Sequence, residues 1–160
     1  MTTSKMSTHY LFTYGTLKSD QPEHAQHCLP PLSITPALAC GDLWRLREGY
    51  PILQVEPELA LLDASKDLLA DWLAALETES KVTPPELDGK WIEGQLFEFP
   101  LEADSLKKMD AWENFIPGVK SVYQRRIIWV KDSDGTDRIA WAYVCYSPPN
   151  WATLLDETSW

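Results

Sequence analysis

The feature of this sequence that most limits its fold is a succession of short β-rich runs separated by turn residues. Only a few helical stretches stand between these runs, a pattern typical of a small sheet or barrel. The sequence therefore predicts an α+β fold, a small mixed or antiparallel β-barrel flanked by short helices. Residues 29–36 contain three prolines and are expected to form a connector, and Gly41 is expected to form a bulge. The runs expected to form strands are residues 9–15, 37–46, 52–55, 91–99, 122–130 and 139–146.

The clearest helix is expected at residues 61–79, where apolar side chains recur at three- and four-residue spacing. Ser65 or Asp63 is expected to cap its first turn. Shorter helices are expected at residues 22–28 and 103–113. The apolar stripe predicted to pack on the domain consists of Leu61, Leu62, Leu68, Leu69, Trp72, Leu73 and Leu76.

Negative charge is concentrated around the long helix. The chain has 24 acidic and 14 basic side chains and a formal net charge of -10. Residues 56–90 hold nine acidic and three basic side chains, a net of -6, which a solvated outer face explains better than a binding patch. Phosphate binding needs clustered Lys and Arg, so the charge argues against a nucleic-acid partner, and equally against an anionic membrane surface.

Length and composition predict a single domain over residues 1–160 with a cytoplasmic location. The sequence contains no apolar run of about 18 residues, and residues 1–9 lack the apolar core of a signal peptide. Three cysteines cannot all pair within one chain, which favours reduced thiols. These cysteines are Cys28, Cys40 and Cys145.

A cluster of metal-ligand types occurs at His24, His27 and Cys28. Its spacing could place two ligands on one helix face, but no fourth ligand has an obvious source. A partly buried helix face is the favoured interpretation, and no metal or cofactor is predicted.

Four segments, in this order, resemble the γ-glutamylcyclotransferase-like (AIG2-like) family, and are closest to its γ-glutamylamine cyclotransferase branch. Residues 11–24 read LFTYGTLKSDQPEH and resemble its opening strand, YGTLK and QP-x-H. Residues 47–51 resemble its YP turn, and residues 92–97 its V-x-G-x-L-Y strand. Residues 109–113, followed by residues 123–125, resemble its LD-x-x-E helix end and Y-x-R strand.

The resemblance implies the fold of that family and an enzyme that releases 5-oxoproline. The α-amine of a γ-glutamyl group attacks its own side-chain amide, and an amine or amino acid leaves. No cofactor is implied, because the substrate carries the nucleophile. One carboxylate must first accept a proton from the substrate ammonium and then protonate the leaving amine, and by the family match that carboxylate is Glu113.

The turn at Tyr14, Gly15, Thr16 and Leu17 is the expected substrate-binding loop. A strand that ends in glycine and enters a helix exposes backbone N–H groups, which attract an anion. The anion would be the substrate's α-carboxylate, and Gly15 would allow the backbone to approach it closely. The Thr16 hydroxyl would touch the ligand or stabilise the turn, and Tyr14 and Leu17 would wall the pocket.

Other residues of the matching segments receive supporting roles. Tyr50 is expected to line the pocket or only to shape the turn, and Tyr123 to orient Glu113 or to pack in the core. Asp110 lies one helical turn before Glu113 and is expected to be a structural hydrogen-bond partner. Arg125 and its neighbour Arg126 are expected on a solvated or ion-paired strand face.

The sequence departs from the family in two places. Lys18, Ser19 and Asp20 stand where family members commonly carry Arg and Gly. Residues 57–88 form a longer stretch than usual, interpreted as a helical insertion that tunes substrate choice or association. The alternative to an enzyme is a non-catalytic member of the same fold that binds a small anion or a partner protein. The sequence specifies neither the leaving amine nor the oligomeric state.

Overall fold

The computed structural model describes residues 8–14, 32–46, 51–63, 67–86, 89–101 and 124–156. Its helical elements are a 3-10 helix, η1 (Pro57–Leu59), and an α-helix, α2 (Leu68–Glu79). The first five strands are β1 (Thr8–Thr13), β2 (Ser33–Cys40), β3 (Asp42–Arg45), β4 (Pro51–Gln54) and β5 (Ala60–Asp63). The others are β6 (Trp91–Pro100), β7 (Gln124–Asp132), β8 (Asp137–Cys145) and β9 (Thr153–Leu154).

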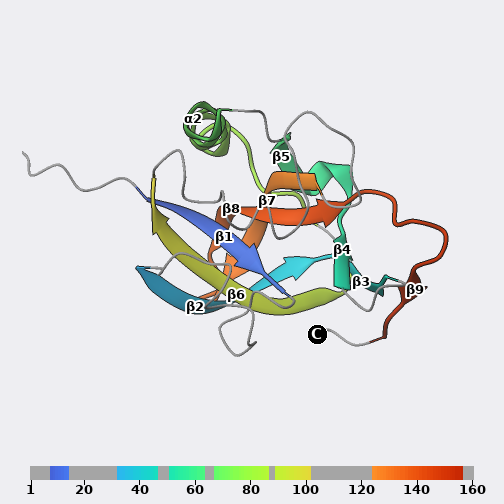
Figure 1. Ribbon diagram of the computed structural model, residues 1–160. Helices are drawn as coiled ribbons and strands as arrows, with labels where there is room; N and C mark the ends of the chain where they lie inside the picture. Colours follow the sequence, from blue (N-terminus) through green and yellow to red (C-terminus); the bar gives the residue numbers. More distant parts are fainter. Residues whose placement is uncertain are drawn as a thin grey trace, which may run out of the picture.

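Five of the strands close into a barrel (Figure 1). The ring runs β7, β2, β6, β1, β8, and the β7–β8 hairpin closes it. Every neighbouring pair in the ring is antiparallel except β1 and β8, which are parallel. Closure leaves these strands with few unpaired edges, which explains how several short strands form a stable sheet. The predicted small mixed β-barrel is therefore confirmed.

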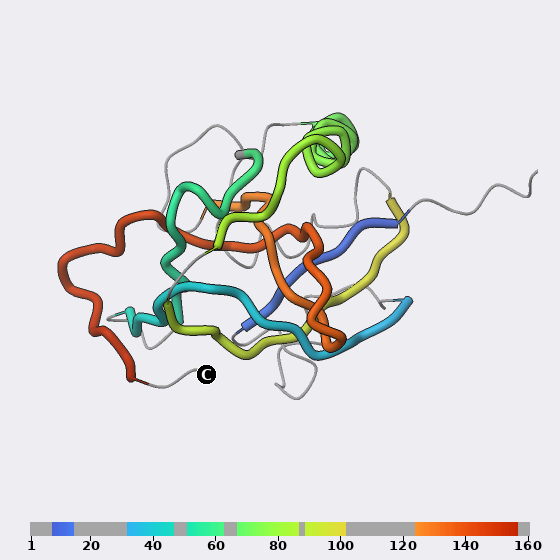
Figure 2. Tube along the Cα trace, turned by 180° about the vertical axis from the view of Figure 1, so that it is seen from behind, coloured from blue at the N-terminus to red at the C-terminus, as the bar shows by residue number. Residues whose placement is uncertain are grey.

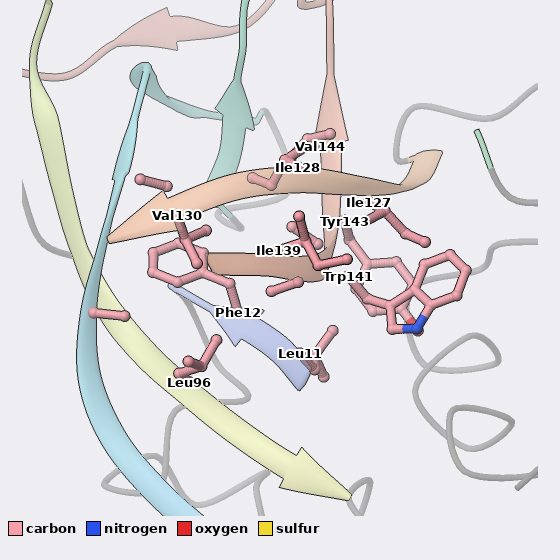
Figure 3. Close-up of a cluster of buried hydrophobic side chains, with 14 of the residues drawn as sticks. Leu11, Phe12, Leu96, Ile127, Ile128, Val130, Ile139, Trp141, Tyr143 and Val144 are labelled. Carbon is pink, nitrogen blue, oxygen red and sulfur yellow. The ribbon is translucent and has the colours of Figure 1, made fainter. Parts of the chain in front are cut away.

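Successive side chains of a strand point to opposite faces of the sheet, so every strand of the ring contributes side chains to the inside of the barrel. Phe12, Val130 and Ile139 are almost fully buried and gather together in Figure 3. Trp141 is also fully buried, and its indole packs at 6.1 Å, between ring centroids, from Trp72 of α2. Apolar packing on both faces of β8 explains why seven consecutive residues of this strand, from Ile139, are buried.

Strands outside the ring extend the sheet from two of its members. β4 is parallel to the end of β8, β3 pairs with β4, and the two-residue strand β9 pairs with β3. On the other side, β5 pairs with β7. Figure 2 shows the chain after β8 running around one side of the molecule to reach β9. The predicted tail at residues 150–160 therefore includes a short strand.

β2 differs from its prediction at both ends. It begins at Ser33, inside the expected connector, and includes Pro36, which lies opposite Gln95 of β6. Only Ala37 and Leu38 pair with β7, so Pro36 lies where one edge is not paired and its missing N–H costs no ladder bond. The chain bends at Gly41 between β2 and β3, where a Cβ would lie 2.3 Å from the Gln54 carbonyl oxygen.

The predicted helix at residues 61–79 is shorter in the structure. Its first residues form β5, because pairing with β7 satisfies backbone groups that a helix would otherwise satisfy. The cap is Asp67, whose carboxylate accepts the backbone N–H of Ala70 at 3.0 Å, so the predicted caps at Asp63 and Ser65 were wrong. The expected insertion at residues 57–88 thus contains a strand as well as a helix.

α2 buries one narrow face rather than the whole predicted stripe. Leu68, Trp72 and Ala75 are buried against the barrel, whereas Leu73 is 58% exposed and Leu76 is 38% exposed. The expectation of an acidic outer face was only partly right, since Asp71 is also buried. With 12 residues, this helix of the described chain is too short to cross a bilayer.

A buried histidine joins α2 to the barrel. His9 of β1 is fully buried, and its Nδ1 accepts the indole N–H of Trp141 at 3.0 Å. The edge of the Trp72 ring packs against it, with the centroids 5.7 Å apart. Burial, together with the positive charge of Arg125, lowers the pKa of His9 to about 4, although the Pro100 carbonyl acts in the opposite direction. His9 is therefore neutral near pH 7.

We expect Gly94→Ala to destabilise the protein by about 2 to 3 kcal/mol or more. A Cβ on Gly94 would lie 2.2 Å from the Thr13 carbonyl oxygen and 2.6 Å from Cζ of Phe12. Gly135→Asn serves as the control, because Gly135 has φ of 80° with open space around it, and Asn tolerates that conformation. Urea denaturation measures both variants, and equal stability of the two would contradict the crowding at Gly94.

The titration of His9 predicts a loss of stability in mild acid. Its folded pKa lies below the ordinary value of 6.5, so the unfolded chain binds the proton more readily. The contribution is complete above pH 6.5 and is lost as the pH falls towards 4. Between pH 7 and pH 5, the wild type should lose about 2 kcal/mol more unfolding free energy than His9→Asn. Parallel losses in urea titrations would contradict a buried neutral His9.

Candidate functional site

One of the predicted site residues, Tyr14, belongs to the described part of the chain. The proposed catalytic Glu113 lies outside the described residues, as do the helices expected at residues 22–28 and 103–113. The metal-ligand types of residues 24–28 and the departures at residues 18–20 also lie outside them. The remaining predicted site residues outside the described ranges are Gly15, Thr16, Leu17, Tyr50, Asp110 and Tyr123.

Tyr14 lies where β8 exchanges one neighbour for another. β1 pairs with β8 in parallel, with Leu11 opposite Trp141, and three residues further along β8, Val144 lies opposite Leu53 of β4. β1 and β4 thus occupy successive positions on β8. A place where one strand leaves a sheet neighbour and another replaces it is a common position for a binding loop in sheet proteins.

The Tyr14 side chain spans this exchange point. Its hydroxyl donates a hydrogen bond to the backbone carbonyl of Tyr143, between the positions where β1 and β4 pair with β8. Its ring stacks on Phe12 with the centroids 6.3 Å apart, and the residue is 6% exposed. Tyr14 was expected to wall a pocket, and in the structure its hydroxyl holds the end of β1 to β8.

Described neighbours of the other predicted residues lie at the same end of β8. Gln124, which follows Tyr123 in the sequence, is opposite Val144 in the β7–β8 hairpin. Pro51, which follows Tyr50, begins β4, and Leu53 two residues later is also level with Val144. Tyr14, Pro51 and Gln124, which are far apart in the sequence, therefore all lie at the same end of the barrel.

The two arginines after Tyr123 were expected on a solvated or ion-paired strand face; Arg125 is buried, which excludes a solvated face for it, and Arg126 is half-buried. Arg125 is 3% exposed, and its guanidinium lies 4.4 Å from the centre of the Trp141 ring. The Arg126 guanidinium lies 3.8 Å from the centre of the Tyr146 ring. Both guanidinium groups therefore make cation–π contacts, one with an aromatic ring of β8 and the other with the ring of the residue that follows β8.

The cysteine at this end of β8 is not prepared for nucleophilic chemistry. Burial raises the pKa of the Cys145 thiol to about 11, although the positive charge of Arg126 acts to lower it. A neutral thiol is a poor nucleophile and a poor metal ligand at pH 7. Among the described residues, no group of three or more His, Cys, Asp or Glu side chains could hold a metal ion.

Several contacts around Tyr14 had no signal in the sequence. The Tyr14 and Tyr143 contact joins residues 129 positions apart, and the His9 and Trp141 contact joins residues 132 positions apart. Gly94 did carry a signal, because it stands inside a β-rich run where glycine indicates a close backbone approach. The approaching backbone is that of Thr13, the residue before Tyr14.

Solved structures share this fold. An AIG2-like protein from Mus musculus superposes with a TM-score of 0.58 at 19% identity, covering 96% of this chain and 88% of the mouse chain. YkqA from Bacillus subtilis gives a TM-score of 0.53 at 18% identity, and the match covers 96% of this chain but 40% of YkqA. An Arabidopsis thaliana protein solved in solution gives 0.51 at 17% identity, with coverages of 93% and 76%.

The sequence itself supplies the family. No curated protein matches it closely. Residues 67–160, more than half of the chain, match the family described as gamma-glutamyl cyclotransferase, AIG2-like. This range includes the matching segments at residues 92–97, 109–113 and 123–125, whereas the YGTL segment precedes it. The chain therefore belongs to the AIG2-like gamma-glutamyl cyclotransferase family.

Proposed function

We propose that this protein is a γ-glutamyl cyclotransferase that releases 5-oxoproline from a small γ-glutamyl amine or peptide. Family membership carries the proposal, because the matching range includes Glu113, the candidate acid–base residue. The convergence of Tyr14, Pro51 and Gln124 at one end of β8 supports it. Those described residues adjoin the predicted substrate-binding residues Gly15, Thr16, Leu17, Tyr50 and Tyr123.

The proposed reaction requires mainly that the protein fix a conformation. The substrate's α-amine and its γ-amide carbonyl carbon must meet in near-attack geometry, which removes an entropic barrier of several kcal/mol. Backbone N–H groups of the YGTL turn would bind the α-carboxylate, with Gly15 leaving room for the ligand. The same donors could stabilise the oxyanion that develops on the amide oxygen.

Proton transfers complete the proposed mechanism. Glu113 accepts a proton from the substrate's ammonium group, and the free amine then attacks the amide carbon and closes the five-membered ring. Glu113 gives this proton to the leaving nitrogen as the old C–N bond breaks. The ring nitrogen then loses its second proton through Glu113, so that the lactam is neutral and the released amine departs as an ammonium ion. Each transfer through a positioned side chain contributes roughly 10²–10⁴-fold. The neutral Cys145 thiol fits a mechanism in which the substrate supplies the nucleophile.

Release of 5-oxoproline from a panel of γ-glutamyl compounds tests the proposal directly. The panel should contain γ-glutamyl alkylamines, γ-glutamyl amino acids and glutathione, with α-glutamyl compounds as controls. Turnover of at least one γ-glutamyl compound, and of no α-glutamyl compound, is expected. Binding of 5-oxoproline without any turnover would favour the non-catalytic alternative, and absence of both would contradict the proposal.

Glu113→Gln is expected to fold normally and to lose turnover by about a hundredfold or more, because an amide cannot accept the proton of the substrate ammonium. Glu86→Gln, on an exposed residue, is the control and should keep full turnover. Initial rates of 5-oxoproline release, with folding verified by circular dichroism, measure the effect. Near-normal release by Glu113→Gln would assign the acid–base role to another group.

Turnover should also fall in acid, as protonation of Glu113 removes the base. The rate should decline as the pH approaches about 4, the ordinary range of a glutamate pKa. Because the His9 titration lowers stability in the same range, circular dichroism must show the protein folded at each pH. A rate that stays constant down to about pH 4 in folded protein would exclude Glu113 as the base.

A further inference from the structure

The end of β1, at Thr13 and Tyr14, is attached to a neighbouring strand on each side. On one side, the ladder with β6 continues to Thr13, which lies opposite Gln95. On the other side, the backbone of β1 pairs with β8 at Leu11, three residues before Tyr14. The Tyr14 hydroxyl reaches β8 at Tyr143, so a side-chain hydrogen bond continues the attachment beyond the backbone pairing.

The Tyr14 ring has little freedom to leave this position. It stacks on Phe12, which is fully buried, and Gly94 leaves the space that Phe12 and the Thr13 carbonyl occupy. Phe12 is in turn packed in the apolar core shown in Figure 3. The hydroxyl is therefore presented to Tyr143 by a rigid ring, and the hydrogen bond requires no ordering of a flexible side chain.

We propose that the Tyr14 hydroxyl is a positioning group: it holds the end of β1 to β8, and binding of the substrate's carboxylate, assigned above to residues 15–17, depends on this attachment. The inference rests on the proposed function for the ligand, but the attachment of β1 to β8 does not. In this proposal the Tyr14 hydroxyl acts through its bond to the Tyr143 carbonyl and not through contact with the substrate.

The hydroxyl can be removed alone. Tyr14→Phe keeps the ring that stacks on Phe12 and deletes the hydrogen bond to Tyr143. Tyr10→Phe, two strand positions from Phe12, is the matched control, because the Tyr10 hydroxyl lies 3.5 Å from a Glu98 carboxylate oxygen near the other end of β1. Both variants should remain folded at the assay temperature, which thermal denaturation verifies.

The kinetic readout separates positioning from loss of folded protein. Tyr14→Phe should raise KM, and the Kd for 5-oxoproline measured by calorimetry, by about tenfold or more, with kcat and the pH profile close to wild type. A partly unfolded sample would instead lower kcat and leave KM unchanged. Tyr10→Phe should match the wild type in every constant. Unchanged KM and Kd in folded Tyr14→Phe would overturn the inference.

Hydrogen–deuterium exchange tests the attachment without any substrate. Peptides covering residues 11–20 should exchange faster in Tyr14→Phe than in wild type, and Tyr10→Phe should not show this change. Equal exchange in all three proteins would overturn the inference. If the wild type neither binds nor converts any γ-glutamyl compound, the proposed function fails. Faster exchange in Tyr14→Phe would then still support the attachment, and the role towards a carboxylate would be rejected.

Discussion

Closure of the barrel depends on β8, because this strand pairs along one edge with β7 and shares its other edge between β1 and β4. β8 is also the centre of the apolar packing, since Ile139–Cys145 are buried throughout. The exchange from β1 to β4 also ends the continuous ladder near Tyr143. A buried side-chain hydrogen bond from Tyr14 spans this position, so the place where β8 changes partner is also next to the predicted binding turn.

The strands could be predicted from local patterns, because alternation and turn residues act over a few neighbouring positions. The β7–β8 hairpin and β6 fell close to their predicted bounds. The start of the long helix could not be predicted in this way. Residues 60–63 have helical apolar spacing, but their pairing with β7 is made by residues more than 60 positions away and favours a strand.

The identity of the candidate site stays a prediction from the sequence, whereas the geometry around Tyr14 had no local signal. The YGTL segment and Glu113 were recognisable from short motifs in order along the chain. Nothing local indicated that Tyr14 would bond to Tyr143, or that Arg125 would be buried on Trp141, because both contacts depend on how β1 and β7 flank β8. A solvated face was wrong for Arg125, since a cation that stacks on an indole has no characteristic sequence spacing, and an ion-paired position for it stays a prediction.

The scale of one hydrogen bond explains why a remote hydroxyl can control a reaction of this kind. A buried carbonyl that loses its donor costs about 1–3 kcal/mol, and each 1.4 kcal/mol of binding is a tenfold change in affinity. In a reaction whose nucleophile belongs to the substrate, the protein contributes mainly by holding reacting atoms in place. Under the proposed function, loss of the attachment at Tyr14 would therefore act on the free energy that holds the substrate in place. The attachment itself joins a rigid, buried ring at the end of β1 to a carbonyl of β8, whose residues 139–145 are all buried.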